Sequence, residues 1–159
     1  MDLLARIQHA LIYIPETGRI HSRLTFPIVQ AGSFADVGIR SGYRYVIIER
    51  TLYQAHRLAF VLNTGSWPLH TVDHINGNKL DNTWSNLRDV PLDVNKQNMR
   101  KATSLSSTGF LGVERSRDKY RARIRVAGVM MSIGTYTTPE AAHEAYIKAK
   151  RKLHTGNTL

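Results

Sequence analysis

The sequence predicts an α+β fold in two parts, and three features of the chain support this prediction. Short stretches with apolar residues at every second position occur in both halves, as half-buried strands require. Other stretches carry apolar residues at the three- and four-residue spacing of a helix. Between the halves, residues 100–109 hold few bulky apolar residues and many Ser and Thr, a composition that is typical of a linker.

We therefore expect a first domain at residues 1–102, a linker at residues 103–108 and a second domain at residues 109–159. A chain of 159 residues has room for one domain or for two small ones. The first domain is predicted to open with a β-rich segment and to continue into a strand–strand–helix core at residues 71–99. The second is predicted to be a three-stranded antiparallel sheet packed on one helix.

The composition limits the classes of partner. The formal net charge is +10, and such an excess favours a polyanionic partner, most simply nucleic acid. The chain has no cysteine, which excludes disulfides and thiolate zinc sites, so we expect no structural zinc and a reducing cytoplasm. No apolar run reaches membrane-spanning length and the start lacks the features of a signal peptide, so we expect a soluble protein with no membrane partner.

The N-terminal segment allows two interpretations at its start. Residues 2–14 carry apolar side chains at helical spacing. Residues 11–20 can equally form a hairpin around the turn at residues 15–18, and we prefer the hairpin. Residues 27–42 contain three glycines and are expected to be rich in loops.

A strand and a helix are expected to follow. Residues 42–48 have apolar side chains on both faces, as in a strand that is covered on two sides. A turn is expected at residues 49–50, and a helix from Leu52 to about Gly65.

Residues 71–99 read as a strand, a polar loop, a strand and a helix. The dipeptide Asn76-Gly77 is a strong turn signal, and residues 87–90 can return as the second strand. Pro91 suits the first turn of the helix, because a missing N–H has no consequence there.

Four side chains of this core can build a hydrolytic site. Asp73 and Asn95 offer the hard oxygen ligands that Mg²⁺ prefers. His74 can deprotonate an attacking water, because imidazole titrates near working pH. Asn86 is expected to hold the imidazole ring through its other nitrogen, and a divalent metal ion would stabilise the leaving oxygen of a phosphodiester.

The stretches DHINGNKLDNTWSNLR and VNKQN resemble the ββα-metal core of HNH nucleases, and they are most similar to the phage and intron-encoded HNH homing endonucleases. The resemblance implies a catalytic pair, His74 and Asn86, and two metal ligands, Asp73 and Asn95, with Asn98 as the alternative for the last position. It further implies one divalent ion, with Mg²⁺ expected and Mn²⁺ as the alternative, and the cytoplasm of a phage-infected or bacterial cell.

The preceding stretch HRLAFVLNTGSWP resembles the segment that commonly comes before this core. It contains His56 and Arg57. These residues are either a buried histidine with a surface arginine or groups that brace the scissile phosphate, and the sequence leaves both interpretations open.

The second domain is predicted from three strands, at residues 110–115, 120–126 and 129–136, and a helix. Thr138 can cap this helix, with Pro139 in its first position and Leu153 near its end. Within residues 120–126, three arginines alternate with apolar residues. Because successive side chains on a strand point to opposite faces, we expect the arginines on one open face of the sheet without acidic partners.

Residues 109–154 resemble the DNA-binding domain of plant ethylene-response factors, through Gly112-Val113, the stretch IGTY at residues 133–136 and the stretch PEAA at residues 139–142. Glu114, Tyr120 and Ser132 depart from the plant pattern, so base specificity cannot be transferred. The resemblance implies that the sheet binds DNA in the major groove. The residues at the start of the linker can contact DNA phosphates. The expected DNA-binding residues are Arg100, Lys101, Arg115, Arg117, Lys119, Arg121, Arg123 and Arg125.

We thus expect a metal-dependent, site-specific endonuclease that acts on double-stranded DNA, is monomeric on its substrate and uses no small-molecule cofactor. One alternative is a DNA-binding protein with a decayed nuclease core. Another is an RNA-binding or ribosomal protein, which would prefer structured RNA to duplex DNA.

Overall fold

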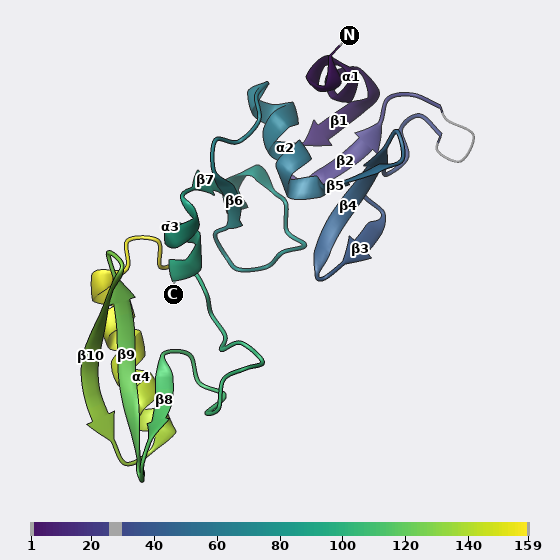
Figure 1. Cartoon of the computed structure of the whole chain (residues 1–159). Coiled ribbons are helices and arrows are strands. Elements are labelled where there is room, and N and C mark those ends of the chain that lie inside the picture. The colour runs from purple at the N-terminus through teal and green to yellow at the C-terminus, as the bar shows by residue number, and fades with distance from the viewer. Residues whose placement is uncertain (1, 26–29, 159) are drawn as a thin grey trace. The chain divides into compact units, whose positions relative to one another are not determined.

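The computed structural model describes residues 2–25 and 30–158 (Figure 1). By its internal contacts the chain divides into two compact units, Met1–Pro91 and Leu92–Leu159. Each unit has its own apolar core, the first around Ile7, Ile20 and Leu58 and the second around Ala122 and Ile124. The described elements are an α+β arrangement of small antiparallel sheets and helices.

The first unit contains both of the elements that the start of the sequence allows. Helix α1 (Leu3–Ala10) is capped by Asp2, whose side chain accepts a hydrogen bond from the backbone N–H of Ala5. The chain then becomes extended at Leu11 and forms a hairpin from β1 (Leu11–Ile14) and β2 (Arg19–Ser22). The preferred hairpin is therefore confirmed, and the helical spacing of the earlier residues is confirmed as well.

A three-stranded sheet follows, with strands β3 (Gly38–Arg40), β4 (Tyr43–Ile48) and β5 (Thr51–Gln54) in the order β3-β4-β5. The predicted helix start at Leu52 is wrong, because Glu49 and Arg50 both have positive φ and turn the chain back along β4. Two successive residues with positive φ are the geometry of a tight hairpin turn.

Helix α2 (Ala55–Thr64) begins only after β5. It ends at Gly65, which adopts the left-handed conformation (φ 78°) of a helix C-cap. Its buried face, which includes Leu58, Ala59 and Val61, contributes to the core of the first unit.

The predicted strand–loop–strand is present. Strands β6 (Thr71–His74) and β7 (Leu87–Val90) are antiparallel, and they place Asp73 opposite Arg88 and His74 opposite Leu87. A single 3₁₀ turn, η1 (Trp84–Asn86), leads from the polar loop into β7.

The second unit begins with α3 (Leu92–Gln97) and continues with β8 (Val113–Ser116), β9 (Lys119–Val126), β10 (Val129–Tyr136) and α4 (Pro139–Leu153). The sheet order is β10-β9-β8, and α4 packs on it through Ala142 and Tyr146. Gly112 (φ 75°) has its α-carbon against the Tyr146 ring, so an added Cβ would lie 2.0 Å from that ring. The first strand starts at Val113 and not at the predicted residue 110, because the positive φ of Gly112 is not a strand conformation.

Helix α4 begins as predicted, with the Thr138 hydroxyl accepting a hydrogen bond from the Ala141 N–H at 3.2 Å and with Pro139 in its first turn. Among the helices that the structure describes, none is long and apolar enough to cross a membrane.

Candidate active site

His74, at the end of β6, is held by a hydrogen bond from its Nε2 to Oδ1 of Asn82 at 2.9 Å. A carbonyl oxygen can only accept, so Nε2 carries the proton and Nδ1 carries the lone pair. Burial lowers the pKa of His74, while the bond to Asn82 and the carboxylates of Asp73 and Asp81 act in the opposite direction. The net lowering keeps the ring neutral at neutral pH, the state that a general base requires.

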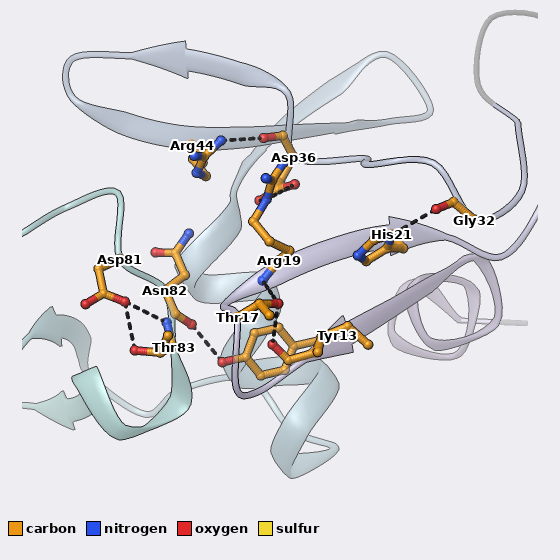
Figure 2. Close-up of polar contacts among 11 residues, drawn as sticks. Tyr13, Thr17, Arg19, His21, Gly32, Asp36, Arg44, Asp81, Asn82 and Thr83 are labelled. Atoms are coloured by element: carbon orange, nitrogen blue, oxygen red, sulfur yellow. Dashed lines mark hydrogen bonds and ion pairs between the residues drawn. The ribbon is translucent and has the colours of Figure 1, made fainter.

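Asn82 is fixed by the N-terminal hairpin. The hydroxyl of Tyr13 donates to the backbone carbonyl of Asn82 at 2.7 Å (Figure 2). Burial and the nearby acidic residues raise the pKa of Tyr13, so its hydroxyl stays protonated and donates. In the turn of the hairpin, Gly18 (φ 68°) leaves no space for a side chain, since a Cβ would lie 2.4 Å from the peptide between Asn82 and Thr83.

Asn86 has a different contact from the expected one. Its Oδ1 accepts from the backbone N–H of Asn76 at 2.8 Å, and its Nδ2 donates to the carbonyl of Asp81 at 2.7 Å. Asn86 therefore closes the polar loop, and the bond to the imidazole ring comes from Asn82 instead. Sequence reasoning missed Asn82, although its place directly after Asp81 in a turn-rich loop was a signal for local hydrogen bonding.

Asp73 is paired with an arginine that sequence reasoning also missed. Arg88 donates to Oδ2 of Asp73 from Nη2 at 2.8 Å and from Nε at 3.0 Å. The carboxylate is only 7% exposed. The signal was available in the pattern of the two strands, because directly opposite residues in an antiparallel pair share a face.

The rings of His74, His56 and Tyr43 come from three different elements and lie close together. The His56 ring, from α2, lies 5.0 Å from the His74 ring in an edge-to-face arrangement, and the Tyr43 ring, from β4, lies 5.2 Å from His56. Lys79 places its ammonium 4.5 Å from the centre of the Tyr43 ring. Burial first, and then His74 and Arg57, lower the pKa of His56 to about 3, so this second imidazole is neutral.

Arg57, the other residue left open, has its guanidinium 6.0 Å from the centre of the Trp67 ring. This is the outer limit of a cation–π contact.

The predicted metal ligands provide hard oxygen atoms. Asn95 lies on α3 and is half-buried, whereas Asn98 is buried and its Oδ1 accepts from Oγ1 of Thr158 at 2.5 Å. Among residues 2–25 and 30–158, no group of three or more His, Cys, Asp or Glu side chains is arranged to hold a metal ion. A carboxylate and an amide oxygen fit an ion such as Mg²⁺, which usually keeps several waters and is completed by substrate phosphate.

The predicted arginine face exists, but it contains an acidic residue. Arg121 and Arg123 alternate with the buried Ala122 and Ile124 along β9. The expectation that the face lacks an acidic partner is wrong, because Glu114 lies opposite Arg121 on β8. Its carboxylate is 3.1 Å from Nη1 of Arg123 and 3.7 Å from Nη1 of Arg121.

The other expected DNA-binding residues are distributed more widely. Arg125 donates to the carbonyl of Gly128 at 2.8 Å, and Lys119 is exposed at the start of β9. Arg115 is paired with Tyr120, and this register places its side chain on the opposite face from Arg121. Arg117 lies in the turn before β9 with φ 53°.

Near the linker, Arg100 donates from Nη2 to the carbonyl of Thr158 at 3.1 Å and to its hydroxyl at 2.7 Å, and Lys101 is exposed.

Comparison with known proteins finds a similarity for the central segment of the chain. Residues 53–100 match the family model described as HNH endonuclease. The match supports an HNH nuclease domain in this segment, and such a domain suggests nuclease activity on DNA. It contains His56, Asp73, His74, Asn82 and Asn86 together with α3. No curated protein and no solved structure matches the chain significantly.

Proposed function

We propose that this protein is a metal-dependent, site-specific DNA endonuclease of the homing type that hydrolyses a phosphodiester of double-stranded DNA. The observation that carries the proposal is the state of His74. This residue is buried, neutral and fixed by Asn82 in the tautomer with its lone pair on Nδ1, and it lies next to Asp73 within the matched segment.

In this proposal His74 accepts the proton of the attacking water through Nδ1. Asn82 keeps the proton on Nε2, and the Tyr13 hydroxyl holds Asn82 in place. Asn86 does not contact the base in this proposal. It holds the polar loop in place by its bonds to the backbone of Asn76 and Asp81. General-base catalysis of this kind contributes about 10²- to 10⁴-fold in rate.

Asp73 and Asn95 are the proposed protein ligands of one divalent ion, Mg²⁺ or alternatively Mn²⁺. When bound, such an ion supplies charge stabilisation to the leaving oxygen of the phosphodiester. Arg88 holds one carboxylate oxygen, Oδ2, of Asp73 and thereby orients the carboxylate. A buried carboxylate that is held in this way needs little reorganisation to bind a cation.

The sheet of the second unit is the proposed DNA-binding surface. Lys119, Arg121, Arg123 and Arg125 lie at alternate positions of β9 and so share one face. The likeness of this region to the ethylene-response-factor domain supports major-groove binding. Arginine is well suited to contacts with phosphates and with bases, because its planar guanidinium binds a phosphate or a guanine edge through two hydrogen bonds.

Plasmid cleavage tests the proposal. Purified full-length protein should nick or linearise plasmid that contains the host phage or bacterial DNA in the presence of Mg²⁺ or Mn²⁺, and EDTA should stop the reaction. His74→Ala should slow cleavage by about 10²- to 10⁴-fold while DNA affinity, measured by fluorescence anisotropy, stays unchanged.

The control is His70→Ala, which removes an exposed imidazole that lies outside the ring cluster. Wild-type cleavage rates in His74→Ala would refute the assignment of the base. DNA binding without cleavage in any divalent ion would leave a DNA-binding protein with an inactive nuclease core.

A further inference from the structure

Residues 154–158, here called the C-terminal tail, lie against α3, the helix that carries Asn95. The hydroxyl of Thr158 donates to Oδ1 of Asn98 at 2.5 Å, and it accepts from Nη2 of Arg100 at 2.7 Å. The backbone N–H of Gly156 donates to Oε1 of Gln97 at 3.0 Å. The tail is thus bonded to the last turn of α3 and to the residues that follow it.

The packing of the tail on α3 is close enough to exclude a side chain. A Cβ added to Gly156 would lie 2.4 Å from the carbonyl oxygen of Val94 and 2.7 Å from its Cγ1. Non-bonded carbon atoms normally approach to about 3.5–4.0 Å, so the backbone of Gly156 rests directly on the helix. Val94 immediately precedes Asn95, and a displacement of one moves the other.

A buried lysine fixes the chain at the other end of this contact. Lys150, on α4, is 1% exposed, and its Nζ donates to the carbonyl of Met99. Burial and the neighbouring Arg100 lower the pKa of Lys150 to about 8. Lysine is almost never fully buried without a partner, so the bond to Met99 accounts for its position.

These contacts are needed because α3 is short. It has six residues and no buried residue of its own, and an isolated helix shorter than about 12 residues is not stable in water. Gly156 bonds Gln97 in the last turn of the helix, and Thr158 and Lys150 bond the residues that directly follow it, Asn98 to Arg100. We attribute the order of α3 to these contacts.

We propose that the C-terminal tail and Lys150 are positioning elements that keep α3 ordered, and with it the side chain of Asn95, the proposed metal ligand that this helix carries. This inference rests on the proposed nuclease function and adds a role for residues far outside the matched segment. The segment matched to the HNH endonuclease family ends at residue 100, whereas the proposed positioning residues are Lys150, Gly156 and Thr158.

The first test uses the Thr158 hydroxyl. Thr158→Val keeps the shape of the side chain and removes both hydrogen bonds. It should raise the Mg²⁺ concentration for half-maximal plasmid cleavage by about tenfold, the lower end of the effect of losing a group that orients a metal ligand. The rate at saturating Mg²⁺ should fall much less, and DNA affinity in EDTA should stay unchanged.

Matched variants separate positioning from general damage. Thr158→Ser should behave as the wild type, because it restores the hydroxyl. Thr155→Val makes the same change at an exposed position of the same tail and should have no effect. Gly156→Ala should raise the Mg²⁺ concentration for half-maximal cleavage more than Thr158→Val does. Gly38→Ala should leave this concentration unchanged, because its Cβ would meet nothing nearer than 3.8 Å.

A second measurement is independent of activity. Amide hydrogen exchange of residues 92–98 in metal-free protein should be faster in Thr158→Val and Gly156→Ala than in the wild type and Thr158→Ser. Unchanged exchange and unchanged metal dependence would overturn the inference. A parallel loss of DNA affinity and of protection in β8–β10 would also overturn it, because the tail would then only maintain the fold of the sheet.

The two proposals can fail separately. If the wild-type protein cleaves no DNA with any divalent ion, the proposed function fails. The exchange of residues 92–98 then decides on its own whether the tail orders α3.

Discussion

Each unit of the molecule contains a carboxylate beside an arginine, and the two groups differ in their exposure to solvent. In the first unit Asp73 is 7% exposed and Arg88 24%, whereas in the second Glu114 is 43% exposed and Arg123 39%. Burial strengthens an interaction between charges and makes the loss of one partner costly, while solvent and salt screen an exposed pair. The pair of Asp73 and Arg88 is therefore part of the structure of the first unit, whereas Glu114 and Arg123 of the second remain available to a partner molecule.

The largest effect is expected from removing the exposed charges. If Arg121, Arg123 and Arg125 contact phosphates, their joint replacement by alanine should weaken duplex binding by more than about 4 kcal/mol, at about 1.5 kcal/mol for each charged hydrogen bond. The slope of log affinity against log salt should fall by about 3 units. Fluorescence anisotropy across a salt series measures both.

The matched control replaces Lys148, Arg151 and Lys152 of α4 by alanine, which changes the net charge by the same amount on another element. If the control weakens binding as much as the arginine triple variant does, only net charge is involved and the sheet face has no special role.

The buried pair should show its effect in stability. Arg88→Met leaves the Asp73 carboxylate without this guanidinium and should lower the free energy of unfolding by about 3 kcal/mol, the lower end for a broken buried pair, because Arg88 is partly exposed. Both tryptophans, Trp67 and Trp84, lie in the first unit, so their fluorescence during denaturation follows this unit.

Arg6→Met is the control, since Arg6 and Glu49 form an ion pair at 3.2 Å in which both side chains are about half-exposed. An exposed pair is worth at most about 1 kcal/mol. Equal losses in the two variants would contradict the contrast between buried and exposed pairs.

A smaller effect concerns pH. Because the pKa of His56 is about 3 in the folded protein and about 6.5 in the unfolded chain, the unfolded chain binds more protons between these values. Stability is therefore complete above pH 6.5 and falls with decreasing pH, at about 1.4 kcal/mol for each pH unit, or about 2 kcal/mol at pH 5. His56→Leu should remove this part of the acid sensitivity.

The measurement is the free energy of unfolding from chemical denaturation at a series of pH values, for the wild type and His56→Leu. His70→Leu is the control, because His70 is exposed. The prediction fails if His56→Leu keeps the acid sensitivity of the wild type.

The smallest effect is expected at Glu114. Glu114→Gln removes the negative charge from the arginine face and should raise duplex affinity slightly, by about 0.5 kcal/mol, without changing stability, since exposed pairs contribute little. Glu144→Gln, on α4, is the control with the same change of charge. A marked loss of stability in Glu114→Gln would show that the pair with Arg123 is structural.

The backbone of the candidate site follows from the sequence because its signals are local. Asn76-Gly77 marks the turn, and apolar residues at the expected positions mark β6 and β7, so the strand–loop–strand was predicted within one or two residues. The arginines of β9 were predicted in the same way, from alternation along one strand. In both cases the pattern depends only on neighbours in the chain.

Two of the contacts that were missed connect elements that are distant in the sequence. Neither the Tyr13 bond to Asn82 nor the His56 contact with His74 has a periodic signal, since each depends on how separate elements pack. Helix α2 was misplaced for a related reason. The turn at residues 49–50 was predicted, but the strand that follows it, β5, was not, because its formation depends on pairing with β4.

The hydrogen bond from Tyr13 to Asn82 joins residues that are 69 positions apart. Closing a flexible loop of this length costs about 4 kcal/mol in chain entropy, from the logarithm of the loop length. We therefore expect this contact to form after the local hairpins and turns. Until that closure occurs, the chain lacks the Tyr13 bond that holds Asn82, the residue that orients the imidazole of His74.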